Sequence, residues 1–302
     1  MTLSPALAAY TLATMPRVDA HCHLSSLDMM EDYLEMRGIL KDKYDVNLEV
    51  FIDLQDYNEA REPLRPGPAG LDYLKEAEER HNGRFLSCIA DYQIADGLAF
   101  PPQELAQWQT LGVVGYKIWV GISPLVDHPA NDPTFTKMEQ LGMVGAAVHI
   151  SQPYPRNCKV LYDFWEAINA WERVLDRHPD LIVVNAHMMN LFYSDEQLEY
   201  LQYFLATYPN VSVDLSARFQ DFHALDRDKT RTFFIKYADR ILFGTDCSEE
   251  PSEGRHQQTA ERYVRCFQLL ETDKMVDGGF FGKSSMRGLD LPLDVLEKIY
   301  YK

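Results

Sequence analysis

The chain has 302 residues, 46% of them hydrophobic, and its 46 acidic against 29 basic residues give a formal charge of −17. This charge argues against nucleic acid or an anionic membrane surface as a partner. No apolar run approaches the roughly 20 residues that span a bilayer, and the N-terminus lacks the basic start of a signal peptide. The five cysteines are widely spaced and odd in number, which indicates reduced thiols. We expect a cytoplasmic protein that binds a small-molecule substrate, with its oligomeric state, a homo-oligomer included, left open.

Short apolar segments that read as buried strands alternate with helical segments along the chain. The eight strand segments span residues 17–23, 47–54, 84–91, 113–121, 145–150, 181–187, 210–216 and 240–246. Successive strands begin about 32 residues apart, which suits a strand, a helix and two loops. Their apolar, β-branched character is typical of a parallel sheet that is buried on both faces. Because no linker or repeat interrupts the pattern, we predict an α/β fold, a distorted (β/α)8 TIM barrel, as a single domain over residues 1–302.

Helical segments follow the strands. Ser25 or Ser26 is placed to cap the first helix, over residues 27–38, and Gly38 is placed to end it. Further helices are expected over residues 71–81, 102–112, 135–142, 159–178, 194–208 and 227–238. The amphipathic tail, residues 291–302, is expected to pack as a closing helix.

Five residues that can bind a metal ion stand at or near the ends of these strands. They are His21 and His23 on the first strand, His149 on the fifth, His187 on the sixth and Asp246 on the eighth. Side chains two residues apart point to the same side of a strand, so His21 and His23 face one way. The carboxyl ends of all strands meet at one mouth of a (β/α)8 barrel. The sequence therefore predicts a metal site at the C-terminal mouth.

Imidazole and carboxylate donors suit zinc and other divalent transition metals. Such an ion lowers the pKa of a bound water from about 15.7 to near 7, which makes it a nucleophile at neutral pH. Asp246 can bind the ion and also accept the proton of that water. A single buried histidine is most often an ordinary core residue, but four histidines and an aspartate at strand ends in this order indicate a shared site.

Five motifs together resemble the amidohydrolase superfamily, and in particular its amidohydrolase-2 branch. They are VDAHCH (18–23), GYKIW (115–119), VHI (148–150), NAH (185–187) and FGTD (243–246). The resemblance covers nearly the whole chain and implies a distorted (β/α)8 barrel with one divalent ion, commonly zinc. It implies His21, His23, His149 and Asp246 as metal ligands and His187 as a catalytic acid or base. The Met-Met-Asn that follows His187 departs from the Gly-rich turn common in the branch, which puts substrate contacts beside this histidine in doubt.

Lys117 lies in the fourth strand, where two-metal members of the superfamily carry a carbamylated lysine that bridges both ions. A carbamate needs a neutral amine, and therefore a depressed pKa, and His187 would then bind the second ion. The interpretation we adopt is an unmodified ammonium near the mouth that takes part in catalysis and pairs with Asp246 or a substrate carboxylate. We accordingly expect one metal ion.

Two further residues are candidates for substrate binding. Arg218, shortly after the seventh strand, can hold a carboxylate or phosphate through its planar guanidinium. Trp119, near the end of the fourth strand, can supply an aromatic wall. The alternative for both is an ordinary surface or packing residue.

Three functions fit these residues. The first, which we favour, is a metal-dependent hydrolase in which a metal-activated water attacks the carbonyl of an amide, ester or lactone, and the metal with His187 or Lys117 stabilises the oxyanion. The second is a metal-dependent decarboxylase of an aromatic or unsaturated carboxylic acid, in which His187 assists protonation of the carbon that loses CO2. The third is a non-catalytic barrel that keeps a structural or sensing metal. The first two need the same metal-binding residues, so the sequence does not separate them.

Overall fold

Eight short parallel strands form one sheet in the order in which they occur along the chain. In the computed structural model they are β1 (Arg17–Cys22), β2 (Leu48–Leu54), β3 (Phe85–Ile89), β4 (Gly115–Trp119), β5 (Val144–His149), β6 (Val183–Asn185), β7 (Val211–Asp214) and β8 (Ile241–Leu242). The structure describes residues 5–24, 26–54, 75–76, 79–81, 84–89, 102–119, 126–150, 164–248, 255–277 and 284–302. Each predicted strand segment overlaps one observed strand, so the predicted series of eight is confirmed.

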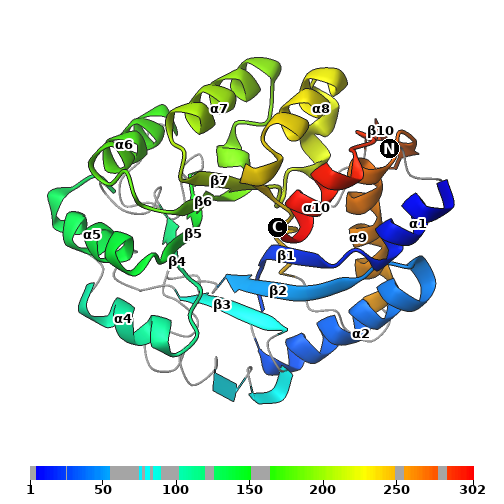
Figure 1. Cartoon of the computed structure of the whole chain (residues 1–302), viewed down its shortest axis with the longest axis horizontal. Helices are drawn as coiled ribbons and strands as arrows, with labels where there is room; N and C mark the ends of the chain where they lie inside the picture. Colours follow the sequence, from blue (N-terminus) through cyan, green and yellow to red (C-terminus); the bar gives the residue numbers. More distant parts are fainter. Residues whose placement is uncertain are drawn as a thin grey trace.

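Helices alternate with the strands and form an outer layer around them (Figure 1). The α-helices are α1 (Pro5–Thr14), α2 (Leu27–Tyr44), α4 (Pro102–Thr110), α5 (Asp132–Leu141), α6 (Phe164–Arg177), α7 (Asp195–Thr207), α8 (Arg227–Lys236), α9 (His256–Glu271) and α10 (Leu293–Tyr301). Short 3-10 turns are η2 (Pro129–Asn131), η3 (Ala186–Asn190), η4 (Phe219–Ala224) and η5 (Ala238–Arg240). The buried apolar side chains of both layers form one large core, as the continuous apolar strand segments predict.

The sheet closes on itself between its first and last strands. Cys22 and Cys247 form a parallel bridge. The Ala20 N–H donates to the Phe243 carbonyl at 2.9 Å, and the His23 N–H donates to the Cys247 carbonyl at 2.8 Å. Because β8 has only two residues, these few bonds replace a regular ladder. The predicted distorted (β/α)8 barrel is confirmed.

α10 packs against the N-terminal ends of the strands, as predicted for a closing helix (Figure 1). The Phe243 N–H donates to the Ile299 carbonyl at 3.0 Å. Nearby, Arg17 at the start of β1 is only 1% exposed and pairs with Glu271 of α9 at 2.8 Å. The Tyr300 hydroxyl donates to the same carboxylate at 2.9 Å. A buried ion pair therefore joins β1, α9 and α10 at the end of the barrel opposite the predicted site.

The first predicted helix, over residues 27–38, differs from the observed α2 at its C-terminal end. α2 runs through Gly38 to Tyr44, and its C-cap residue Asp45 has a left-handed backbone with φ 54°. Met36 and Leu40, on either side of the glycine, are fully buried on this helix. Their packing outweighs the roughly 1 kcal/mol that a glycine inside a helix costs, so the prediction that Gly38 ends the helix is wrong.

The predicted start of the same helix is confirmed. Ser26 caps α2, since its hydroxyl accepts the Met29 N–H at 3.1 Å.

Some observed elements have no counterpart among the predicted ones: α1, α9 and the antiparallel pair β9 (Met275–Val276) and β10 (Met286–Arg287). Most of the helix predicted over residues 71–81, and residues 159–163 of another, lie outside the described residues.

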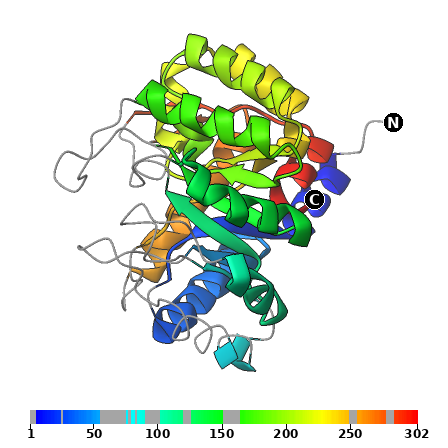
Figure 2. The same cartoon turned by 90° about the vertical axis from the view of Figure 1, so that its left-hand side faces the viewer.

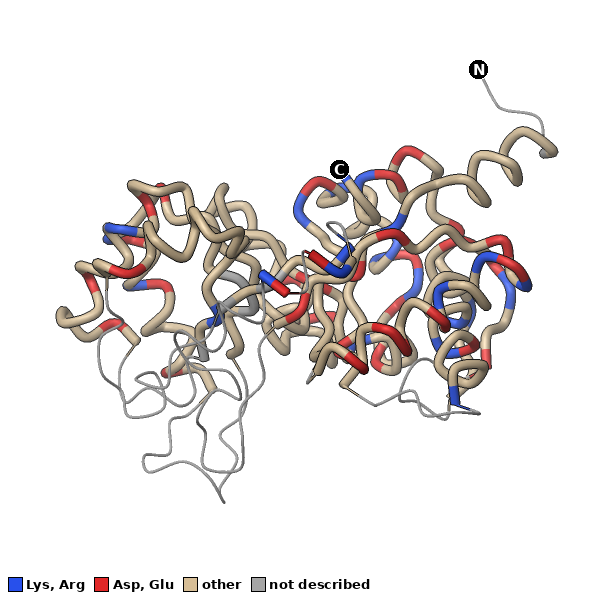
Figure 3. The backbone as a smooth tube through the Cα atoms, turned by 90° about the horizontal axis from the view of Figure 1, so that it is seen from below, with Lys and Arg blue, Asp and Glu red and all other residues tan. Residues whose placement is uncertain are grey.

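α1 and α10 lie together on one side of the molecule (Figure 2), which is the side of the strands' N-terminal ends. Figure 3 shows Lys and Arg interspersed among Asp and Glu along the helices of the described part. No helix within the described ranges combines the length and apolar character required to cross a membrane.

The Arg17–Glu271 ion pair at the N-terminal end of the barrel leads to a prediction about stability. Glu271→Gln leaves the Arg17 guanidinium buried without its carboxylate, and removal of one partner of a buried pair lowers the free energy of unfolding by about 3 kcal/mol. Lys298→Ala breaks the exposed Lys298–Asp239 pair and should lower it by at most about 0.5 kcal/mol. Urea unfolding of both variants tests this, and equal losses would contradict the importance of the buried pair.

Candidate metal centre

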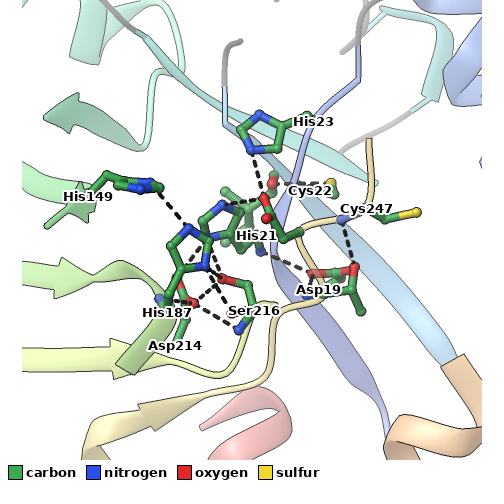
Figure 4. A network of polar contacts seen from close by, with 12 residues as sticks. Asp19, His21, Cys22, His23, His149, His187, Asp214, Ser216 and Cys247 are labelled. Atoms are coloured by element: carbon green, nitrogen blue, oxygen red, sulfur yellow. Dashed lines mark hydrogen bonds and ion pairs between the residues drawn. The ribbon is translucent and has the colours of Figure 1, made fainter. Parts of the chain in front are cut away.

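The five predicted metal-site residues converge at the C-terminal ends of the strands (Figure 4). His21 lies within β1 and His23 directly follows it, His149 is the last residue of β5, His187 lies in η3 after β6, and Asp246 lies shortly after β8. The imidazole rings of His21 and His187 are 4.9 Å apart, and those of His149 and His187 are 4.7 Å apart. Parallel strands in a closed barrel bring these positions together although up to 225 positions separate them in the sequence.

Asp246 is the anionic centre of this group. Its Oδ1 lies 3.2 Å from His21 Nε2 and 3.1 Å from His23 Nε2. One donor atom from each of His21, His187 and Asp246 lies within 4.8 Å of the other two. Two ligands that share an ion at about 2.0–2.2 Å lie roughly 3.0–3.4 Å apart in octahedral or tetrahedral geometry. The separations around Asp246 are therefore those of ligands on one ion.

The end of β7 orients two of the histidines. His21 Nδ1 donates to Asp214 Oδ2 at 2.8 Å, and His187 Nδ1 lies 2.9 Å from the Ser216 backbone carbonyl. A carbonyl only accepts, so His187 carries its proton on Nδ1 and a lone pair on Nε2. The Ser216 hydroxyl, which donates to Asp214, lies 2.9 Å from both Nδ1 atoms. β7 thus turns the Nε2 atoms of His21 and His187 toward the mouth.

The same proton assignment extends to His149. His187 Nε2 lies 3.2 Å from His149 Nδ1. Because His187 Nε2 is the acceptor, His149 Nδ1 donates and the lone pair of His149 is on Nε2. The hydrogen bond from His187 Nδ1 to the Ser216 carbonyl leaves His187 Nε2 as an acceptor, and it therefore determines the tautomer of His149 as well.

The charges of the group differ sharply. Burial opposes a positive charge on His21, but Asp214 and Asp246 outweigh it and raise the pKa of His21 to about 9. Burial lowers the pKa of His187 to about 4, and burial together with His187 lowers that of His149 well below its usual value. Burial favours the neutral acid at Asp246, yet hydrogen bonds from His21 and His23 hold the pKa of Asp246 well below its usual range. At neutral pH Asp246 is therefore a carboxylate and His21 a charged imidazole, whereas His149 and His187 are neutral imidazoles.

The backbone around the site takes uncommon conformations. His187, Met188, Met189 and Asn190 all have positive φ, between 52° and 58°, and Asp246 has φ 61°. Such left-handed residues other than glycine cost on the order of 1 kcal/mol each and persist where other contacts hold them. The His187 N–H donates to Asp214 Oδ1 at 3.0 Å, and the Asp246 N–H donates to the His21 carbonyl at 2.7 Å. The Met-Met-Asn segment thus forms a left-handed turn without glycine.

These residues fit a divalent cation. Buried neutral imidazoles and a carboxylate are the donor types of zinc sites. The Nδ1 of His23 is buried and has no hydrogen-bond partner among the described residues. Asp214 on His21 Nδ1 is the carboxylate that metal-binding histidines commonly have behind them. The three donor atoms that lie within 4.8 Å of one another include His187 and do not include the predicted ligands His23 and His149, so the predicted division between ligands and acid or base stays a prediction.

Lys117 and Trp119 both belong to β4. Lys117 is 3% exposed, and its charge contributes to the lowered pKa of His149 and acts on Cys88 of β3. Lys117 therefore lies near the predicted site, as expected, while its pairing with Asp246 or substrate stays a prediction. Trp119 is the last residue of β4, and its side chain lies outside the described residues.

Arg218 follows the β7 strand end but already has partners within the protein. Its Nη1 lies 3.1 Å from Asp221 Oδ2 and contacts the Tyr193 hydroxyl, and its guanidinium lies 5.1 Å from the Tyr193 ring centre. The Tyr193 hydroxyl in turn donates to Asn190 Oδ1 at 3.2 Å. Arg218 Nε is buried without a hydrogen-bond partner in the described part of the chain. A substrate anion would therefore have to compete with Asp221 and Tyr193 for Nη1.

Several residues that position the site have no counterpart in the sequence prediction. They are Asp19, Asp214, Ser216, Thr245 and Tyr263. Asp214 and Ser216 occur at a strand end, the same signal that identified the five predicted residues. Asp19 stands two residues before His21. Strand-end polarity was therefore available for Asp214, Ser216 and Thr245, but not for Asp19, which lies inside β1, or for Tyr263, which belongs to α9.

Comparison with known proteins places the chain among enzymes of related architecture. The family model Amidohydro_2, described as Amidohydrolase, matches residues 18–302. The search of curated proteins found no match. Similar solved structures include an uncharacterised TIM-barrel protein from Bordetella bronchiseptica, with 14% identity, 95% of each chain covered and a TM-score of 0.57.

Two other similar structures carry the names of activities. A 2,6-dihydroxybenzoate decarboxylase from Rhizobium shares 19% identity over 83% of this chain and 98% of its own, with a TM-score of 0.51. A 5-carboxyvanillate decarboxylase from Sphingomonas paucimobilis shares 12% identity over 95% of this chain and 97% of its own, with a TM-score of 0.54. At these identities the likeness shows the fold alone.

The contact between Asp214 and His21 makes a prediction for the metal-free protein. In Asp214→Asn the pKa of His21 should fall from about 9 toward its ordinary value, because the adjacent negative charge is lost. The raised pKa stabilises the fold fully below about pH 6.5, and this contribution is lost as the pH rises through 9. Wild type should therefore lose stability between pH 6.5 and 9.5, and Asp214→Asn should lose less. Imidazole NMR titration and thermal unfolding measure both effects.

A matched control is Asp132→Asn, which removes a carboxylate 3.4 Å from His178, another buried histidine. It should leave the titration of His21 unchanged. A His21 resonance that titrates near 6.5 in the wild type would contradict the assignment.

Proposed function

The chain belongs to the amidohydrolase family, and on this premise we propose that it is a metal-dependent hydrolase that attacks the carbonyl of a small amide, ester or lactone. The observation that carries the proposal is the position of the Asp246 carboxylate, within 3.2 Å of the Nε2 atoms of two histidines at the barrel mouth. A carboxylate so placed can bind a cation and accept a proton from an attacking water.

His21, His23, His149 and Asp246 are the proposed ligands of one divalent ion, with zinc the favoured metal. When bound, such an ion supplies a Lewis acid and lowers the pKa of water to near 7. The tautomers support this ligand set, because β7 leaves a lone pair on His21 Nε2 and, through His187, on His149 Nε2. His21 must release its extra proton to bind the ion, since the pKa of His21 is about 9 in its absence.

His187 and Lys117 are the remaining proposed catalytic residues. The low pKa of His187, about 4, keeps its imidazole neutral, and its Nε2 lone pair accepts a hydrogen bond or a proton at the mouth. Once protonated, His187 can donate that proton to the leaving group. The Lys117 ammonium is proposed to stabilise negative charge that develops on the carbonyl oxygen.

Arg218 and Trp119 are the proposed substrate-binding residues. Arg218 Nε, which has no hydrogen-bond partner among the described residues, is proposed as one donor to a carboxylate of the substrate, and exchange of Asp221 would free Nη1 for a second. Trp119 ends the strand that carries Lys117 and is proposed to supply an aromatic wall. A small substrate with an anionic group and an apolar or aromatic part fits both.

Decarboxylation of an aromatic acid is the second candidate function. Two of the similar solved structures are named as decarboxylases of hydroxylated benzoates. The same metal-binding residues would serve, with His187 assisting protonation of the ring carbon that loses CO2. A purely structural or sensing metal is less well supported, since all five predicted residues are present and gathered at the mouth.

Metal stoichiometry tests the proposed ligand set. Wild type should hold one equivalent of zinc, and Asp246→Ala should lose it, because the only carboxylate among the proposed ligands is gone. His187→Asn should keep the equivalent and lose activity by about 10²–10⁴-fold, the usual contribution of a positioned acid or base. Elemental analysis of the three proteins measures this. Two equivalents in wild type that fall to one in His187→Asn would favour the two-metal site with a carbamylated Lys117.

Product analysis separates the two reactions. We expect the zinc-loaded protein to release acid from members of a panel of aryl esters, lactones and amides, and no CO2 from hydroxybenzoates. Arg218→Gln should raise KM about 10- to 100-fold for substrates with a carboxylate and leave neutral ones unchanged, since a charged hydrogen bond contributes about 1.5–3 kcal/mol. Arg173→Gln is the control, because the Arg173 side chain on α6 is exposed. CO2 release without hydrolysis would replace the first proposal with the second.

A further inference from the structure

Three of the four proposed ligands lie on the two sides of the β1–β8 junction, and the fourth, His149, ends β5. His21 and His23 belong to the β1 side, and Asp246 belongs to the β8 side. Only a few backbone hydrogen bonds join the two sides here, among them Asp246 N–H to the His21 carbonyl at 2.7 Å. The distance between the two strand ends therefore sets the distance between the ligands.

Asp19 connects both sides of this junction through its side chain. Its Oδ1 accepts the His21 N–H on β1 and the Thr245 N–H after β8, both at 3.1 Å. Its Oδ2 accepts the Thr245 hydroxyl at 2.6 Å and the Tyr263 hydroxyl at 2.5 Å. Asp19 and Thr245 are fully buried, as is Tyr263. One of the two backbone donors belongs to His21, a proposed ligand, and the other belongs to Thr245, which precedes the proposed ligand Asp246.

Gly244 shows how closely the two strand ends approach. A Cβ atom at this position would lie 2.9 Å from the His21 Cβ, closer than real Cβ contacts. Two residues later Asp246 has the left-handed φ of 61°, which other contacts must hold. Thr245 lies between the two and donates two hydrogen bonds to Asp19, one from its N–H and one from its hydroxyl, which also lies 3.2 Å from the Tyr263 hydroxyl. The conformation of Asp246 therefore depends on a neighbour that Asp19 immobilises.

We propose that Asp19, Thr245 and Tyr263 form a positioning cluster that sets the separation of His21 and Asp246 and thereby the affinity of the site for its metal ion. The inference rests on the proposed function, because it concerns the same ion. None of the three side chains is a proposed ligand, so the cluster acts through the backbone of His21 and Asp246. Tyr263 makes α9 part of the support of the site.

A purely structural role is the alternative, and the molecule contains a matched case. At the opposite end of the barrel Tyr300 donates its hydroxyl to the buried Glu271 carboxylate at 2.9 Å. Tyr300, like Tyr263, is buried and packs against Phe267 and Phe243. Tyr300→Phe therefore removes a comparable hydrogen bond far from the metal-binding residues.

The experiment measures the Kd for Zn²⁺ in the full-length protein by competition with a chromogenic chelator. Tyr263→Phe, Thr245→Val and Tyr300→Phe are compared with wild type, and the thermal unfolding of each metal-free protein is recorded. Loss of an outer partner typically weakens metal binding 10- to 100-fold. We expect Tyr263→Phe and Thr245→Val each to raise Kd by about 10-fold or more, and Tyr300→Phe to stay within about twofold of wild type.

Different failures are distinguishable. If wild type binds Zn²⁺ while Tyr263→Phe and Thr245→Val keep its Kd, the positioning cluster is overturned and the proposed function stands. If Tyr300→Phe weakens binding as much as Tyr263→Phe, the effect reflects general stability and the cluster is again overturned. If wild type itself does not bind Zn²⁺, the proposed metal site and the inference fall together. Thr245→Val supplies the answer should Tyr263→Phe fail to fold.

Discussion

The hydrogen bond from the Asp246 N–H to the His21 carbonyl, 2.7 Å long, lies where the first and last strands of the barrel meet. Seven of the eight strand contacts are ladders between neighbours in the sequence. The eighth has to join segments more than 200 residues apart, and it does so with β8, a strand of two residues. The Asp19 side chain adds to this contact, because its carboxylate accepts hydrogen bonds from the His21 N–H on β1 and from the Thr245 N–H after β8. The metal-binding candidates depend on this junction because they occupy both of its sides.

A second constraint is the left-handed backbone around the mouth. Ala217 and Asp246, together with the four residues from His187 to Asn190, have positive φ without being glycine. Specific contacts hold several of them, such as the bond from Asn190 Nδ2 to the Ile150 carbonyl at 2.6 Å. Sharp turns immediately after short strands bring the side chains back over the barrel opening. Strain of this kind is concentrated at the mouth, where strand ends are most closely interconnected.

Buried carboxylates determine the charge of the histidines. Asp214 behind His21 raises the pKa of that imidazole despite its burial, whereas His187, whose Nδ1 faces a neutral carbonyl, has a lowered pKa. Two histidines 4.9 Å apart therefore differ in charge because of what lies behind them. Burial lowers the pKa of both histidines, and only at His21 do the adjacent carboxylates of Asp214 and Asp246 outweigh it.

Much of this protein was determined by its sequence alone. The spacing of apolar segments predicted eight strands in order, because a strand buried on both faces must be continuously apolar. Strand-end histidines and Asp246 predicted a shared site, because parallel strands present all their carboxyl ends at one mouth. The tertiary structure decided what depends on atoms from distant segments: that buried neighbours carry α2 past Gly38, that β7 sets the tautomers of His21 and His187, and that Tyr263 reaches Asp19. Such contacts leave no periodic pattern in the chain, since each joins single residues whose distance is fixed only when the barrel closes.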